Sequence, residues 1–138
     1  MSIATWPARH LSVSIARPPS EVYAFAADPA NLTRWAAGLA RGFSRGGDGS
    51  WVAASPMGEV IVRFVERNAL GVLDHDVTLP GGETVTNPVR VVPNGNGSEV
   101  VFTLFHRPGM TDDDVARDAA AVQRDLETLR GLLERARA

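Results

Sequence analysis

The chain has 138 residues, of which 44% are hydrophobic and 22% charged, with 14 basic against 16 acidic side chains and a net charge of −2. A single domain of this size buries enough surface to fold without a metal or a disulfide, and the balanced charge argues against nucleic-acid binding. The sequence has no cysteine and no lysine, which excludes thiol catalysis, cysteine zinc sites, disulfides, Schiff-base chemistry and a phosphate-loop lysine.

The first quarter of the chain predicts a strand followed by two short helices. Residues 10–15 alternate polar and apolar side chains, which is typical of a half-buried strand. The proline pair at 18–19 ends this strand and suits the first turn of a helix. Asp28 is a good N-cap and Pro29 a good first residue for a second helix, which carries Trp35.

The middle of the chain changes to a period of two residues, which predicts antiparallel strands joined by turns rich in Gly, Pro and Asn. Pro88 interrupts one of them and predicts an edge, a bulge or a bend at that point. The predicted strands cover 39–43, 50–53, 59–66, 72–79, 83–92 and 99–106.

The C-terminal part predicts one long amphipathic helix. Six apolar residues are spaced four, three, four, three and four apart, which places them on one helix face. Thr111 and Asp114 have the spacing of a capping box at its start. The apolar face consists of Val115, Ala119, Val122, Leu126, Leu129 and Leu133.

This order of elements predicts the α+β class, because a meander of antiparallel strands must bury one face against the single long helix. Four segments carry a family resemblance: SVSIARPPSEVYAFAADPANLTRW at 12–35, GVLDHDVTL at 71–79, NPVRVVPNGNGSEVVFTLF at 87–105, and the acid-capped terminal helix. With them the chain resembles the START-like superfamily, also called SRPBCC or polyketide cyclase/dehydrase-like. The resemblance implies one helix-grip domain over 1–138, with a curved sheet of six to seven strands wrapped on the terminal helix. It also implies a partly open pocket between sheet and helix, but it is compatible with lipid carriers, hormone receptors, chaperone co-factors and a few cyclases, so it does not select a function.

His75 is the one candidate acid or base. On its strand it shares an apolar face with Leu73 and Val77, whereas Asp74 and Asp76 point to the opposite face, so the three residues form neither a triad nor a metal site. In one interpretation His75 lies in the cavity and moves a proton or orients a ligand carbonyl. In the other, which we favour, it is a core histidine satisfied by a neighbour, or one at the cavity mouth.

Two further polar residues have open interpretations. Asn87 shares a face with Val89 and either binds a ligand or satisfies the bend before Pro88. Arg41 either meets an anionic ligand or, as we favour, packs its stem and extends its charge into water. His10 and His106 lie at strand ends without a carboxylate spacing that would complete a metal site.

The large aromatic residues, Tyr23 among them, either line the pocket or fill the core, and the resemblance favours the pocket. We expect no metal and no cofactor. The predicted ligand-binding residues are Trp35, Trp51, Phe64, Leu73, His75, Val77, Asn87, Val89, Ala119 and Val122.

Three functions stay open at this point. The first is binding of a small hydrophobic, lipid- or polyketide-like ligand. The alternatives are a polyketide cyclase or dehydratase that uses His75, and a protein-interaction domain with a filled core. The N-terminal residues lack the charged start and apolar centre of a signal peptide and no apolar run is long enough to cross a membrane, so we expect a cytoplasmic protein.

A homodimer is a further expectation, because the strand at 99–106 is apolar on both faces and only one of them can meet the helix. The other face needs a cover, either from the short helices or from a second subunit. The two sets are Val100, Phe102 and Leu104 on one face, and Val101, Thr103 and Phe105 on the other.

Overall fold

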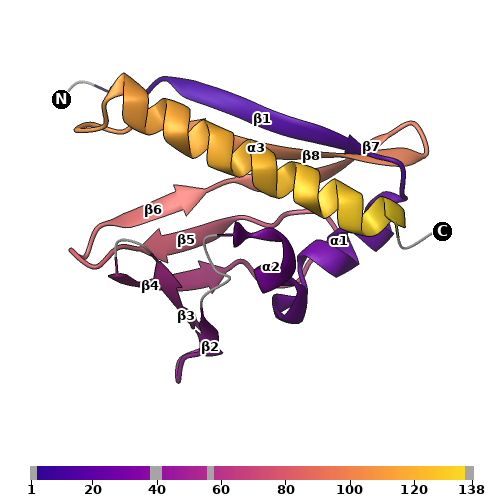
Figure 1. Ribbon diagram of the computed structural model, residues 1–138, viewed down its shortest axis with the longest axis horizontal. Coiled ribbons are helices and arrows are strands. Elements are labelled where there is room, and N and C mark those ends of the chain that lie inside the picture. The colour runs from indigo at the N-terminus through magenta and orange to yellow at the C-terminus, as the bar shows by residue number, and fades with distance from the viewer. Residues whose placement is uncertain (1–2, 38–41, 56–57, 136–138) are drawn as a thin grey trace.

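The computed structural model describes residues 3–37, 42–55 and 58–135. Three helices and eight strands lie in these ranges, in the predicted α+β order. Two short helices follow the first strand, a run of antiparallel strands comes next, and one long helix ends the chain (Figure 1). The elements are β1 (Ala8–Ile15), α1 (Pro19–Ala26), α2 (Pro29–Trp35), β2 (Phe43–Arg45), β3 (Trp51–Ser55), β4 (Gly58–Phe64), β5 (His75–Thr78), β6 (Thr84–Asn87), β7 (Val89–Asn94), β8 (Gly97–Phe105) and α3 (Asp112–Arg135).

The strands form two antiparallel sheets, of order β1-β8-β7 and β2-β3-β4-β5-β6. The strand predicted over 83–92 is two strands, because Pro88 separates β6 from β7, and this break raises the strand count from seven to eight. The sheets are linked just before β5, where the Leu73 N–H donates to the Val89 carbonyl and the Val91 N–H to the Gly71 carbonyl, both at 2.8 Å. The segment before β5 therefore continues the sheet from β5 to β7.

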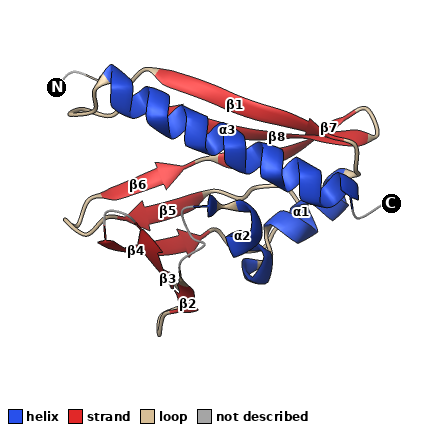
Figure 2. Ribbon diagram, in the orientation of Figure 1, coloured by secondary structure: helices blue, strands red, loops and turns tan. Residues whose placement is uncertain are grey.

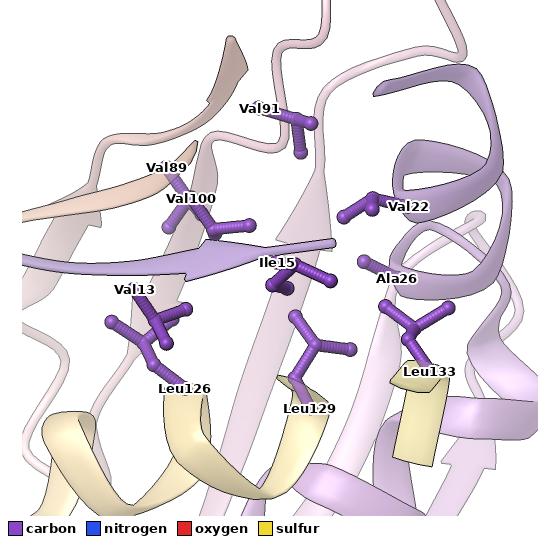
Figure 3. Close-up of a cluster of buried hydrophobic side chains, with 10 residues drawn as sticks. All are labelled: Val13, Ile15, Val22, Ala26, Val89, Val91, Val100, Leu126, Leu129 and Leu133. Carbon is purple, nitrogen blue, oxygen red and sulfur yellow. The ribbon is translucent and has the colours of Figure 1, made fainter. Parts of the chain in front are cut away.

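The long helix is held by the main hydrophobic core. Figure 2 shows α3 passing in front of β8, with α1 and α2 beside its C-terminal half. Each buried Leu or Ile side chain in this core contributes about 1.5–3 kcal/mol to folding. In Figure 3 the side chains of this cluster converge from β1, α1, β7, β8 and α3; they are Val13, Ile15, Val22, Ala26, Val89, Val91, Val100, Leu126, Leu129 and Leu133.

The apolar face predicted for α3 is confirmed. Five of its six residues are buried, and only Val122 is partly accessible. The predicted capping box also forms, because the Asp114 N–H donates to Thr111 Oγ1 and the Thr111 N–H to the Asp114 carboxylate, each at 3.0 Å.

The two faces of β8 differ in burial. Val100 and Leu104 are buried, so their set faces the helix, whereas Val101 and Phe105 are half-buried. Trp6 covers part of the outer face by an edge contact with Phe105, with ring centroids 6.3 Å apart. A homodimer through this face stays a prediction.

None of the helices in the described ranges is long and apolar enough to cross a membrane. The cytoplasmic location stays a prediction.

Candidate functional site: a cavity under the long helix

A cavity of about 220 Å³ lies between the helices and the sheet. Its walls come from α1, α2 and α3 on one side and from β4, β5, β7 and β8 on the other. Most of the lining side chains are apolar, and seven of the ten residues predicted to bind a ligand are among them. These seven are Trp35, Phe64, Leu73, His75, Val77, Val89 and Val122.

A second cavity of about 230 Å³ lies next to the first. The two share a wall made of Val77, Phe102 and Val122, which line both. Asn87 lines the second cavity and not the first, so the predicted site is divided into two chambers.

The other predicted residues lie elsewhere. Trp51 lines neither cavity, because it stacks on Phe43 in the five-stranded sheet, with ring centroids 4.7 Å apart. Ala119 is buried in a small cluster with Leu104 and Val115 and also lines neither cavity. Arg41 lies outside the described residues, as does most of the strand predicted over 39–43.

His75 both lines the cavity and has hydrogen-bond partners, so the two interpretations of this residue are compatible. Its Nδ1 lies 3.1 Å from the Leu73 carbonyl oxygen, and the Asn87 side-chain amide lies 3.4 Å from its Nε2. Because a carbonyl only accepts, Nδ1 carries the proton, and the lone pair of Nε2 faces the Asn87 N–H. Burial lowers the pKa of His75, which favours this neutral ring.

Asp74, the residue before His75, is engaged with Arg90 and the backbone of β7. Asp74 accepts from Arg90 at 2.8 and 3.0 Å and from the Val89 N–H at 2.9 Å. The hydrogen bonds from Arg90 hold the pKa of Asp74 below its ordinary value. Its carboxylate is therefore committed to an ion pair on the outer face of the sheet.

Asp125 is a cavity residue that the sequence analysis missed. It lies on α3, three residues after Val122, and its carboxylate accepts the Ala37 N–H at 3.2 Å. Burial raises the pKa of Asp125. Its signal in the sequence is an acid three residues after Val122, which places it beside Val122 at the edge of the apolar helix face.

The loop between β4 and β5 supplies the mouth of the cavity, which sequence patterns also missed. Among the lining residues that the structure describes, Val65 and Arg67 are the exposed ones. Asn68 organises the loop: its side-chain amide donates to the Glu66 and Val72 carbonyls at 2.9 Å and accepts the Leu70 and Val72 N–H groups at 3.0 Å. Its own N–H donates to the Tyr23 hydroxyl at 3.0 Å, which ties the loop to α1.

The described residues contain no group of three His, Asp or Glu side chains placed to hold a metal ion. His10 lies 3.1 Å from the Thr103 hydroxyl, and His106 lies 2.7 Å from the Met110 carbonyl. Each of these two histidines is thus engaged within its own part of the fold.

Comparisons with known proteins identify the family. No curated protein matches the sequence. The solved structure of DynU16, from the dynemicin biosynthetic locus, superposes with a TM-score of 0.71 at 18% identity, over 92% of this chain and 47% of that one. The chain thus spans about half of DynU16.

Two other structures match over nearly their whole length. Ara h 8.0201 has a TM-score of 0.68 at 13% identity, over 91% of this chain and 96% of that one. The Aha1 dimer from Colwellia psychrerythraea has a TM-score of 0.71 at 14% identity, over 90% of this chain and 93% of that one. These structures show a shared fold. The model of the family described as polyketide cyclase / dehydrase and lipid transport matches residues 10–134, so the chain belongs to this family and to the START-like superfamily that its sequence resembles.

Proposed function

We propose that the chain binds a small, largely apolar molecule in the cavity between the sheet and α3. The observation that carries this proposal is the cavity of about 220 Å³, lined mostly by apolar side chains from both layers. Protein cores are otherwise packed with few voids larger than a water molecule. An apolar ligand in this space gains about 25 cal/mol for each Å² of apolar surface removed from water.

The two alternatives have less support. A domain with a filled core would lack such a cavity. For an enzyme, the candidate acid or base is His75, and both of its ring nitrogens already face protein groups, the Leu73 carbonyl and the Asn87 amide. We therefore assign His75 and Asn87 to the cavity walls rather than to a reaction.

The test uses a neutral fluorescent probe, N-phenyl-1-naphthylamine, and a variant that fills the cavity. Val122→Phe places a ring at the wall shared by both chambers, and Ala116→Phe is the matched control at an exposed position of the same helix. We expect Val122→Phe to weaken probe binding by about tenfold or more, and Ala116→Phe to change it by less than about twofold.

If Val122→Phe does not fold, Val77→Phe on β5 fills the same wall from the opposite side. A wild-type protein that binds no probe, or a folded filled variant that binds as well as the wild type, would overturn the proposal. As a separate measurement, native mass spectrometry of the protein taken from its own host would give the mass of a resident ligand and show whether the chain is a dimer.

A further inference from the structure

Arg67 places a cation at the mouth of the cavity. Arg67 lines the cavity and is exposed, and within the described residues its side chain has no ion pair and no hydrogen bond. Its guanidinium carbon lies 5.9 Å from the centroid of the Tyr23 ring. Five other arginines each pair with a carboxylate: Arg17, Arg63, Arg90, Arg107 and Arg117.

The backbone beside this cation is held by hydrogen bonds. The residue that follows it, Asn68, is fixed by its own side-chain hydrogen bonds and by the bond from its N–H to the Tyr23 hydroxyl. A cation carried on an ordered loop loses less entropy on binding a ligand than one carried on a disordered loop. Arg67 also presents a planar set of N–H donors, which matches the two oxygens of a carboxylate.

A second donor lies beside it. The Tyr23 oxygen accepts the Asn68 N–H, so its own O–H is available to donate toward the cavity that Tyr23 lines. The acidic residue of the lining, Asp125, is on α3 and faces Ala37. An anionic group is therefore favoured at the mouth and disfavoured next to Asp125.

We propose that the ligand is an amphipathic acid, whose apolar body fills the cavity and whose carboxylate pairs with Arg67 at the mouth. This inference rests on the proposed function and specifies its ligand class. The Tyr23 hydroxyl donates a second hydrogen bond to the same anionic group.

Two probes with one ring framework test it: 8-anilinonaphthalene-1-sulfonate, which is anionic, and N-phenyl-1-naphthylamine, which lacks the sulfonate. The variant is Arg67→Gln, and the matched control is Arg130→Gln, at an exposed position of α3 away from both cavities. We expect Arg67→Gln to weaken binding of the anionic probe about 5- to 10-fold and to leave the neutral probe within about twofold. Arg130→Gln leaves both unchanged.

Salt gives an independent measurement on the same proteins. Raising the salt concentration weakens binding of the anionic probe to the wild type more than to Arg67→Gln, and it does not weaken the neutral probe. If both probes bind and Arg67→Gln leaves the anionic one unchanged, or weakens both equally, the amphipathic-acid inference is wrong and the cavity proposal stands. If neither probe binds the wild type, the cavity proposal itself is wrong.

Discussion

Gly71 is the position where a single added carbon atom should break the link between the two sheets. Its φ angle is +75°, and its carbonyl accepts the Val91 N–H at 2.8 Å. A Cβ at this position would overlap the carbonyl oxygen of Val91 and lie 3.2 Å from its carbonyl carbon. Both atoms belong to the backbone of a buried strand residue, so relieving the overlap requires the strand itself to shift.

The cost of Gly71→Ala follows from these two features. A residue other than glycine in a sparsely populated backbone region costs about 1–3 kcal/mol. Relieving the overlap moves Val91 away and weakens a hydrogen bond that contributes about 1 kcal/mol. The expected loss is about 2–4 kcal/mol, which is a large part of the roughly 5–15 kcal/mol that stabilises a domain.

Urea unfolding followed by circular dichroism measures this loss, with Gly81→Ala as the control. A Cβ at Gly81 meets no heavy atom within 4 Å, so we expect the control to change the unfolding free energy by less than about 0.5 kcal/mol. Gly71→Ala should also weaken binding of the neutral probe, because Val72 and Leu73 line the cavity. Equal urea midpoints for the two variants would refute the reasoning.

Three other predictions concern the lining and the mouth. Burial raises the pKa of Asp125, so its carboxylate destabilises the folded state above that pKa. Asp125→Asn should therefore raise the urea midpoint at neutral pH but not at about pH 3, where the carboxyl group is protonated in both states. The control Glu127→Gln should not raise the midpoint at neutral pH, and a lowered midpoint for Asp125→Asn at that pH would contradict the prediction. Burial lowers the pKa of His75, so the unfolded state gains the proton first as the pH falls below 6.5 and stability decreases there. His75→Gln should remove that decrease from unfolding curves measured between neutral pH and about pH 5, and an unchanged slope would count against it. Asn68→Ala should cost about 2 kcal/mol and speed hydrogen exchange at the Val72 amide, whereas equal protection of that amide would show that Asn68 does not order the loop.

The helices and strands were predictable because an element buried on one face has apolar residues that recur at a regular spacing in the sequence. The spacing of the apolar residues from Val115 to Leu133 has a single helical solution, and five of the six are buried in α3. The alternation around Val13 and Ile15 places both in the main core. Pro88 correctly predicted a bend. It did not predict that β6 and β7 belong to different sheets, because this depends on which strands β7 pairs with, and those strands are distant in the sequence.

The site was harder to predict, because alternation tells which face a side chain is on and not whether that face is packed or hollow. Trp35 and Trp51 are both large and partly buried, yet only Trp35 borders the cavity, whereas Trp51 packs on Phe43 away from it. Arg67 and Asn68 lie in a loop, where apolar residues do not recur at a regular spacing. Their role at the mouth depends on Tyr23, which is more than forty positions away in the sequence.

The difference between packed core and open cavity explains why the sequence predicts the fold but not the ligand. Leu129 is fully buried, and shortening it to Ala would cost about 2–5 kcal/mol, since the surrounding core cannot close around the gap. Ala27 and Ala36, by contrast, line the cavity, so a larger side chain at either position can extend into open space. The usual penalty of overpacking is thus reduced at these positions. Changes there can reshape the cavity while the core around Leu129 holds the fold, so two chains can share every helix and strand and select different ligands.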